Sequence, residues 1–505
     1  MSPPMNALMT RRISLILSIA IAFTAAGLVW FSTPWGVGTT FDSIQYLLGA
    51  LALADGGSVF DLPAHWPPLY PVLLAVVDLF TDDIHAAARL FHTFVFAANV
   101  WLFSLLVTDG AQRGGVHVLL GTSVFALAPA VYGIHFMAWS EPPFIGLLLA
   151  HLWCMRRYFR SGSGSGSGRW LLVGGLIVGI AILTRYAGVA MLGATSLFLL
   201  LERGPDIRER LADLVRFVVP AAALPAIWFA GSSLFSQDSS VRELEVHWVT
   251  TEHLKAFASV LLDWFQAQTL GTVAATVLLV ACIACIMVAV ARGATSEDAR
   301  LLRLTLLLAL TYVAFIAVSI SLFDFYIPVD SRIFAPLLVC LLVAITVSAA
   351  VALPRATILA PVASTVLLVT LLAGLPSLSN AVARNTIQGF GYFGAMVQTM
   401  PILGFLRDAS LPTVYSNAPE LLRIHFGWKA AAIPALYDPS TRLPEPEYSA
   451  RMDRMMEEFA AGRAAIVYFE AFSWRAYLPG RDVFEGNLAL PSVYRADDGV
   501  VYLAP

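Results

Sequence analysis

Charged side chains are scarce in this sequence. Asp, Glu, Lys and Arg make up only 13% of its 505 residues, whereas 58% of the residues are hydrophobic and the mean hydropathy is +0.75. About a quarter of the residues of a typical soluble globular domain are charged, so this composition excludes that class. The long apolar runs that take the place of charge predict a polytopic all-α membrane protein.

Cysteine is also rare, and its placement excludes two more classes. The four cysteines all lie within apolar runs, at Cys154, Cys282, Cys285 and Cys340, which argues against a disulfide framework. The "CIAC" segment at 282–285 has the spacing of a zinc-binding pair, but no second pair or histidine accompanies it, so we interpret it as packing. Basic tracts are absent too, and nothing in the charge pattern suggests a nucleic-acid partner.

The apolar runs themselves define the membrane part. The first begins after Arg11 and Arg12 and reaches about Phe31, long enough to cross the roughly 30 Å hydrocarbon layer. No small-residue cleavage site stands out, so we expect a retained first span. Further runs are centred near residues 97, 126, 150, 177, 194, 225, 280, 311, 342 and 366. Together they predict about 11 transmembrane helices.

The basic residues predict the orientation of these spans. With a cytoplasmic N-terminus, the predicted inner loops contain most of the arginines, among them Arg156, Arg157, Arg160 and Arg169. The outer side keeps only Arg89, Arg185, Arg242, Lys255 and Arg332 up to residue 376. This excess of inner positive charge is the usual bias of multi-pass proteins.

The orientation requires that "PPLYPVLLAVVDLF", residues 67–80, does not cross the membrane. It has about fourteen residues and opens with two prolines, which is short for a span. We therefore expect the first outer loop, residues 33–84, to carry two helices at the membrane surface, this one and an amphipathic helix that follows Asp42.

The texture of the sequence changes after residue 376. Short strand-like runs, "TVYSN", "AAIPAL", "AAIVYFE" and "GVVYLAP", alternate with helical patterns such as "EYSARMDRMMEEFAAG". We predict a transmembrane domain over 1–376 and a small soluble α/β domain over 377–505, outside the cytoplasm. The Ser-Gly repeat at 161–168 is interpreted as a flexible cytoplasmic linker.

Ionisable residues near the outer ends of the spans are functional candidates, because charge at membrane depth is costly without a partner or a cavity. They are Asp42 and His65 in the first outer loop, Glu141, Arg185 with Tyr186, and Asp324, Asp330 and Arg332. Structural pairing or helix capping is the alternative for Glu141 and Arg185. Pairing with Asp330 is the alternative for Arg332, and Asp324 is read as a solvated loop residue.

Asp42 is the strongest of these candidates. The helix dipole partly explains an acid in the first turn of a helix that Thr39 or Thr40 can cap. The same loop, however, combines this acid with an amphipathic helix and with the "HWPPLYP" segment. A carboxylate there could accept a proton from an incoming hydroxyl while apolar surroundings exclude bulk water.

Six segments resemble, in order, the GT-C-fold glycosyltransferases, the superfamily of the protein O-mannosyltransferases and the lipid A aminoarabinose transferases. They are Asp42 to Gly56 with Tyr46, "PPLYPVLLA", "AAARLFHTF" around Arg89, "SEPPFIGLLLA", "GLIVGIAILTRYAG" and "DSRIFAPLL". The resemblance covers roughly residues 12–350.

The resemblance implies transfer of a sugar from a polyprenyl-phosphate donor to a lipid, glycan or protein acceptor on the outer face, with inversion. It makes Asp42 the general base, lets Glu141 orient the sugar and assigns the donor phosphate to Arg185 or Arg332. Tyr46, His65, Arg89, Tyr186 and Asp330 are the remaining implied substrate-binding residues. An outward site that uses a lipid-linked donor implies a bacterial inner membrane, or plasma membrane.

The sequence departs from the family pattern at two positions. Ser43 stands where many relatives carry a second acid, and Trp66, preceded by His65, stands where a basic residue often precedes the proline. A lone Asp42 beside Ser43 makes a poor divalent-metal site, so we expect metal independence and no cofactor.

Two other functions compete with the transferase. A secondary transporter would also hold charges in a polytopic bundle, but it usually shows related halves with broken helices near the midplane. We find no internal repeat, and the candidate charges lie at the outer ends of the spans. A non-catalytic membrane assembly protein, whose C-terminal domain binds a partner, is the third hypothesis.

Overall fold

The computed structural model describes residues 5–108, 115–161, 168–201, 206–235, 246, 248–292, 296–325, 327–350, 358–437 and 443–504. The chain divides into two compact units. The first contains Met1–Val37 and Gly49–Ile387, and the second contains Gly38–Leu48 and Gln388–Pro505. The boundary predicted at residue 376 lies inside a helix, Leu359–Gln388.

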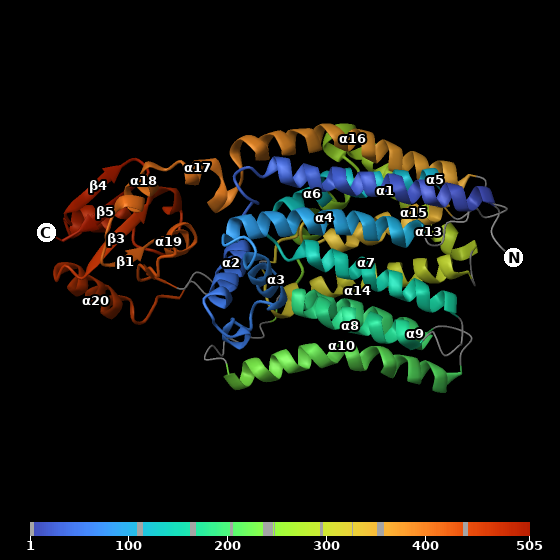
Figure 1. Ribbon diagram of the computed structural model, residues 1–505, viewed down its shortest axis with the longest axis horizontal. Helices are drawn as coiled ribbons and strands as arrows, with labels where there is room; N and C mark the ends of the chain where they lie inside the picture. The colour runs from blue at the N-terminus through green and yellow to red at the C-terminus, as the bar shows by residue number, and fades with distance from the viewer. Residues whose placement is uncertain are drawn as a thin grey trace. The chain divides into compact units, whose positions relative to one another are not determined.

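The first unit is built from helices that run side by side, as α1, α4, α7 and α8 do in Figure 1. Its longer helices are α1 (Met5–Ser32), α4 (Ile84–Thr108), α5 (Gly115–Leu127), α7 (Glu141–Ser161), α8 (Gly168–Thr184), α9 (Val189–Leu201), α10 (Ile207–Phe235), α11 (Thr251–Trp264), α13 (Thr272–Arg292), α14 (Glu297–Leu322), α15 (Ala335–Ala350) and α16 (Leu359–Gln388). Shorter elements are η1 (Val59–Asp61), α3 (Leu69–Asp78), α6 (Pro129–Phe136), η2 (Tyr186–Gly188) and α12 (Ala267–Leu270). Helix α2 (Phe41–Ala54) is divided between the units, because the division falls after Leu48.

Each predicted apolar run is centred in one of these helices, which confirms the polytopic all-α prediction. Among the described residues, six helices are long and apolar enough to cross a membrane. Helices α5 and α6, bent by 48° at a short break, together form a seventh candidate. The break is at Pro129, which lacks the N–H that would continue the helix. The number of about 11 spans stays a prediction.

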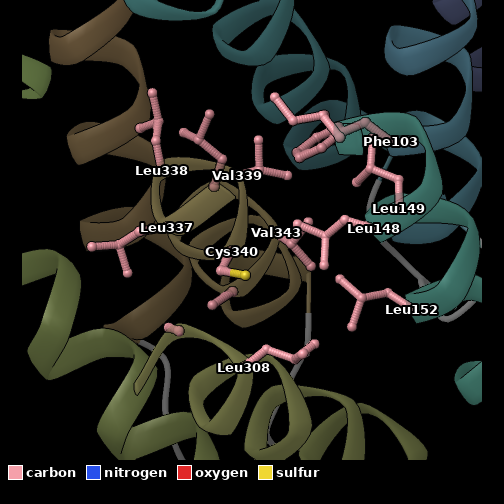
Figure 2. Close-up of a cluster of buried hydrophobic side chains, with 14 of the residues drawn as sticks. Phe103, Leu148, Leu149, Leu152, Leu308, Leu337, Leu338, Val339, Cys340 and Val343 are labelled. Carbon is pink, nitrogen blue, oxygen red and sulfur yellow. The ribbon is translucent and has the colours of Figure 1, made fainter. Parts of the chain in front are cut away.

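The apolar core of this unit surrounds α15. Figure 2 shows Cys340 and Val343 of α15 among Leu149 of α7, Phe103 of α4 and Leu308 of α14. Cys282 and Cys285 are buried in the same core. The two cysteines of the "CIAC" segment thus lie on the packed face of α13.

The proline-rich segment of the first outer loop forms α3, as predicted. Pro68 precedes its first turn, where the missing N–H costs nothing. The helix buries Tyr70, Pro71 and Leu74 and packs against α4. Its position at the membrane surface stays a prediction.

The second unit contains a five-stranded sheet in the order β2-β1-β3-β5-β4. The strands are β1 (Thr413–Ser416), β2 (Ala431–Ala432), β3 (Ala464–Phe469), β4 (Ser492–Ala496) and β5 (Gly499–Leu503). Strands β1, β2 and β3 are parallel, whereas β5 is antiparallel to β3 and β4. The four predicted strands are confirmed, and β4 is an addition.

Helices complete this α/β unit. They are η3 (Gly391–Phe393), α17 (Ala395–Gln398), α18 (Pro401–Asp408), α19 (Pro419–Phe426), α20 (Tyr448–Ala460), η4 (Glu470–Phe472) and η5 (Val483–Asn487). The predicted helix over 447–462 is α20, which buries Met455 and Phe459 against the central strand β3. Apart from Ser161 and Gly168, which end α7 and begin α8, the predicted Ser-Gly linker lies outside the described residues.

The predicted orientation leads to a labelling experiment with two exposed positions, Ser161 at the end of α7 and Thr413 in β1. We expect a membrane-impermeant maleimide to label the Thr413→Cys chain in intact cells. It should label the Ser161→Cys chain only after the cells are opened, because the arginine-rich loops are predicted to face the cytoplasm. Equal labelling of both chains in intact cells would contradict the orientation.

Candidate functional site

Three of the predicted residues meet at the start of α7. Glu141 is fully buried, and its Oε1 pairs with Arg185 Nη1 at 2.7 Å and accepts a hydrogen bond from Arg332 Nε at 2.6 Å. The two arginine side chains are 14% and 11% exposed. We call Glu141, Arg185 and Arg332 the ion triad. With two guanidinium groups and one carboxylate, its formal charge is +1.

The local sequence explains why Glu141 starts a helix. Pro142 and Pro143 follow it, and proline suits the first turn of a helix because its ring fixes φ and the N–H there has no partner in the helix. A carboxylate in that turn also faces the positive end of the helix dipole. Arg185 interrupts the path from α8 to η2 in an extended conformation, with φ −151° and ψ 130°.

Arg332 is directed by a turn that precedes α15. The Asp330 carboxylate accepts the Ile333 N–H at 2.9 Å, and the Ile333 carbonyl accepts the Tyr312 hydroxyl at 2.7 Å. Burial raises the pKa of Asp330, and the Ile333 N–H and the nearby Arg332 charge oppose that shift. Asp330 therefore shapes the loop, and the Arg332 guanidinium pairs with Glu141.

The carboxylate of the triad can accept a further hydrogen bond. Glu141 Oε2 is buried and has no hydrogen-bond partner among the described residues. Arg185 Nη1 also contacts Ser140 Oγ at 3.0 Å, and the Arg332 guanidinium lies 4.4 Å from the centre of the Trp139 ring. The two guanidinium groups at this end of α7 can donate charge-assisted hydrogen bonds to an anionic ligand.

The next residue along the chain, Tyr186, fixes part of the first outer loop. Its hydroxyl donates to the Ala64 carbonyl at 2.6 Å and accepts from Trp228 Nε1 at 3.3 Å. His65 follows Ala64, is half-buried and packs edge-on against Trp66. The structure thus links the His65 loop to Tyr186, and through the chain to Arg185.

Arg89 occupies a different place from the triad. Its Nη2 donates to the Trp30 carbonyl at 2.7 Å and its Nε donates to Thr33 Oγ1 at 3.2 Å. The guanidinium also lies 3.9 Å from the centre of the Trp30 ring. These contacts satisfy a carbonyl at the C-terminal end of α1, where a cation is favoured by the helix dipole.

Asp42 lies in the first turn of α2 and is half-buried, within the second unit. The Thr40 carbonyl accepts the Ile44 N–H, and Ser43 Oγ accepts the Thr40 N–H at 3.0 Å. Ser43, the residue that replaces a second acid, thus helps to cap α2. Tyr46, one turn after Asp42, is only 3% exposed and lies on the buried face of α2.

A polar network that sequence reasoning missed supports the start of α7. Asn99 Nδ2 donates to the Pro142 carbonyl at 2.8 Å and to His135 Nε2 at 2.9 Å. His135 Nδ1 lies 2.7 Å from the Val131 carbonyl, so Nδ1 carries the proton and Nε2 is free to accept. Gly146 leaves room for this amide, because a Cβ there would lie 2.6 Å from Asn99 Oδ1. The network places a hydrogen bond directly beside Glu141.

A second buried histidine joins α4 to α3 of the first outer loop. The Tyr70 hydroxyl of α3 and His92 Nε2 of α4 are 2.6 Å apart, and both residues are fully buried. The sequence feature that could have indicated these contacts is the presence of His92 and Asn99 within an otherwise apolar span, since polar residues at membrane depth are functional candidates. Across the described residues, no three His, Cys, Asp or Glu side chains gather as a metal site.

Comparison with solved structures identifies the fold of the chain. No protein-family model and no curated protein sequence matches the chain. The crystal structure of ArnT from Cupriavidus metallidurans bound to undecaprenyl phosphate matches with a TM-score of 0.61 and 13% identity, over 97% of each chain.

Two other solved structures also match the chain. The apo Archaeoglobus fulgidus oligosaccharyltransferase matches with a TM-score of 0.53 and 10% identity, over 91% of this chain and 69% of that one. The arabinofuranosyltransferase AftD from Mycobacteria matches with 0.55 and 16%, over 98% of this chain and 40% of that one. The chain therefore has the GT-C glycosyltransferase fold and is a multi-pass membrane protein.

Proposed function

We propose that this protein transfers a sugar from a polyprenyl-phosphate donor to an acceptor hydroxyl on the outer face of the plasma membrane. The observation that carries the proposal is the ion triad, in which two largely buried guanidinium groups meet at the start of α7. The fold supports it, because one protein with that fold has been crystallised with undecaprenyl phosphate.

The triad suits the leaving group of this reaction. As the bond between the anomeric carbon and the phosphate oxygen breaks, both electrons stay on that oxygen and the phosphate gains negative charge. Arg185 and Arg332 would stabilise this charge through charge-assisted hydrogen bonds, without the need for a proton donor. Glu141 holds the two guanidinium groups in place before the donor arrives.

Asp42 would supply the other half of the chemistry. An unactivated hydroxyl is a weak nucleophile at neutral pH, and a positioned carboxylate contributes about 10²- to 10⁴-fold by accepting its proton. The acceptor oxygen then bonds to the anomeric carbon from the side opposite to the phosphate, so the configuration inverts. In this scheme the proton goes to Asp42 and no metal takes part.

The function is tested with purified protein in proteoliposomes. The probes are undecaprenyl-phosphate-linked hexoses and pentoses, supplied singly, with extracted envelope lipids and glycans as acceptors. We expect release of undecaprenyl phosphate and transfer of label to an acceptor with at least one sugar. Uptake of labelled solute without any loss of lipid-linked sugar would instead support a transporter.

Arg332→Ala should raise the KM for the donor about tenfold or more, because a hydrogen bond to a charged group contributes roughly 1.5–3 kcal/mol. Arg332→Lys should recover part of the affinity, since it keeps the charge but loses the planar fork. Arg216→Ala is the control, because Arg216 is 52% exposed and pairs with Asp213 within α10. An unchanged donor KM for Arg332→Ala would leave Arg332 with only its structural pairing.

A further inference from the structure

The segment that carries Asp42 belongs to the same compact unit as the C-terminal domain. Two hydrogen bonds join them. The Thr39 N–H donates to the Phe390 carbonyl at 3.2 Å, and the Tyr392 N–H donates to Thr39 Oγ1 at 2.8 Å. Thr39 is 1% exposed, so both bonds are shielded from water.

The backbone between these two bonds is shaped for the contact. Gly391 has φ +70°, and a Cβ there would lie 2.0 Å from the Thr39 carbonyl oxygen. A side chain at this position would be strained by its φ and would also collide with the Asp42 segment. The approach of the two chain segments thus depends on a glycine.

Tyr392 is held at each of its polar groups. Its hydroxyl donates to Glu420 at 2.6 Å and accepts from Arg475 Nη2 at 2.7 Å, and its carbonyl accepts from His425 Nε2 at 3.1 Å. Burial, reinforced by the Glu420 charge, raises the pKa of Tyr392, so the hydroxyl stays protonated and donates. The position of the Tyr392 N–H that binds Thr39 is thus fixed from several directions.

The sheet anchors this arrangement. Arg475, 7% exposed, pairs with Glu420, and its Nη1 donates to the Asn417 carbonyl at 2.7 Å. The Asn417 side chain exchanges hydrogen bonds with the Phe469 N–H and carbonyl at 2.8 and 2.9 Å, which joins the ends of β1 and β3. A buried ion pair contributes little net stability, because the cost of desolvating both charges offsets their attraction. We call Tyr392, Glu420 and Arg475 the domain clamp.

The clamp residue Tyr392 binds the chain at Thr39, shortly before Asp42. Thr39 is bonded to the clamp, Thr40 and Ser43 close the first turn of α2, and Asp42 lies in that turn. Because Asp42 lies only three positions after Thr39, in the capped first turn of α2, a shift at Thr39 moves the carboxylate. We propose that the C-terminal domain positions Asp42 through the clamp and Thr39, an inference that rests on the proposed role of Asp42 as base.

Thr39→Val tests the hydrogen bond between Tyr392 and Thr39, because it removes the acceptor of the Tyr392 N–H with little change of shape. With the undecaprenyl-phosphate-linked sugar that the wild-type chain uses, we expect kcat to fall about 10- to 100-fold, since a misplacement of about 1 Å can cost 10²-fold. The donor KM should change by less than about twofold. Thr39→Ser keeps the hydroxyl and should retain most of the rate.

A matched pair of tyrosines provides the control. Tyr392→Phe and Tyr415→Phe each remove a hydrogen bond from a tyrosine to a glutamate of the same unit, to Glu420 and Glu458 respectively. Only Tyr392 is joined to Thr39. We expect about a tenfold loss of kcat for Tyr392→Phe and a wild-type rate for Tyr415→Phe. Equal rates for the two variants would overturn the proposal.

A double variant separates positioning from simple weakening of the fold. In an Asp42→Asn background the carboxylate is already gone, so adding Thr39→Val should lower the residual rate by less than about twofold. A further loss as large as in the wild-type background would show that Thr39 acts otherwise than through Asp42. If Asp42→Asn is slow but Thr39→Val transfers sugar at the wild-type rate, only the positioning proposal is refuted. A wild-type rate for Asp42→Asn would instead refute the proposed role of Asp42 as base.

Discussion

Asp42→Asn is expected to lower the rate of sugar transfer at least about 100-fold, within the range that general-base catalysis contributes. The amide keeps the shape of the side chain and its ability to act as a polar group in the first turn of α2, but it cannot accept the proton of the acceptor hydroxyl. Expression and thermal unfolding should therefore match the wild-type chain. The measurement is the initial rate of transfer by purified protein at saturating donor.

Two further variants identify the cause of this loss. Asp42→Glu keeps a carboxylate and should retain part of the activity if the longer side chain can reach the acceptor. Asp61→Asn is the matched control, because Asp61 is an exposed carboxylate of the same loop that caps η1. Purified Asp42→Asn protein that transfers sugar at the wild-type rate would return Asp42 to the role of a helix-start residue.

The sequence was sufficient to predict the class and most elements, because hydrophobic period and length are local signals. The centres of the apolar runs lie in helices, and β1, β3, β5 and α20 occur where alternation or helical spacing predicted them. Strand β4 was missed, since "SVYRA" has a weak apolar pattern and is ordered by pairing with β5. Such pairing is a property of the fold and not of the segment.

The sequence predicted the individual residues of the site but not which of them pair. Glu141, Arg185 and Arg332 were each singled out by the cost of charge at membrane depth. Their pairing joins residues as far as 191 positions apart, so no local pattern reveals it. Asp330, nearer along the chain, was the obvious partner of Arg332, but it also caps the Ile333 N–H, and the guanidinium reaches Glu141.

The link between Asp42 and the C-terminal domain was invisible for the same reason. The hydrogen bond from Tyr392 to Thr39 spans 353 positions. The boundary predicted from composition at residue 376 places residues 38–48 and 388–505 in different domains, whereas the structure groups them in one compact unit. Gly391, whose φ is positive, was a local hint, but a glycine shortly after the end of a helix has many ordinary explanations.

The ion triad gives the second large effect, on stability. Glu141→Gln removes the only carboxylate from the triad and leaves two buried guanidinium groups beside each other. Removal of one partner from a buried pair typically costs about 3–5 kcal/mol, so we expect a marked fall in the midpoint of unfolding in detergent. Arg216→Ala, which breaks an exposed pair, should lose no more than about 1 kcal/mol.

A neutral triple variant separates this structural cost from the proposed chemistry. Glu141→Gln combined with Arg185→Met and Arg332→Met removes all three charges, and neutral replacement of a whole buried cluster is often harmless to stability. We therefore expect the unfolding midpoint to recover most of the loss while donor turnover stays undetectable, because no cation remains to stabilise the departing phosphate. A stable and active triple variant would show that the arginines serve only the fold. A Glu141→Gln chain as stable as wild type would instead show that the two guanidinium groups do not depend on the carboxylate.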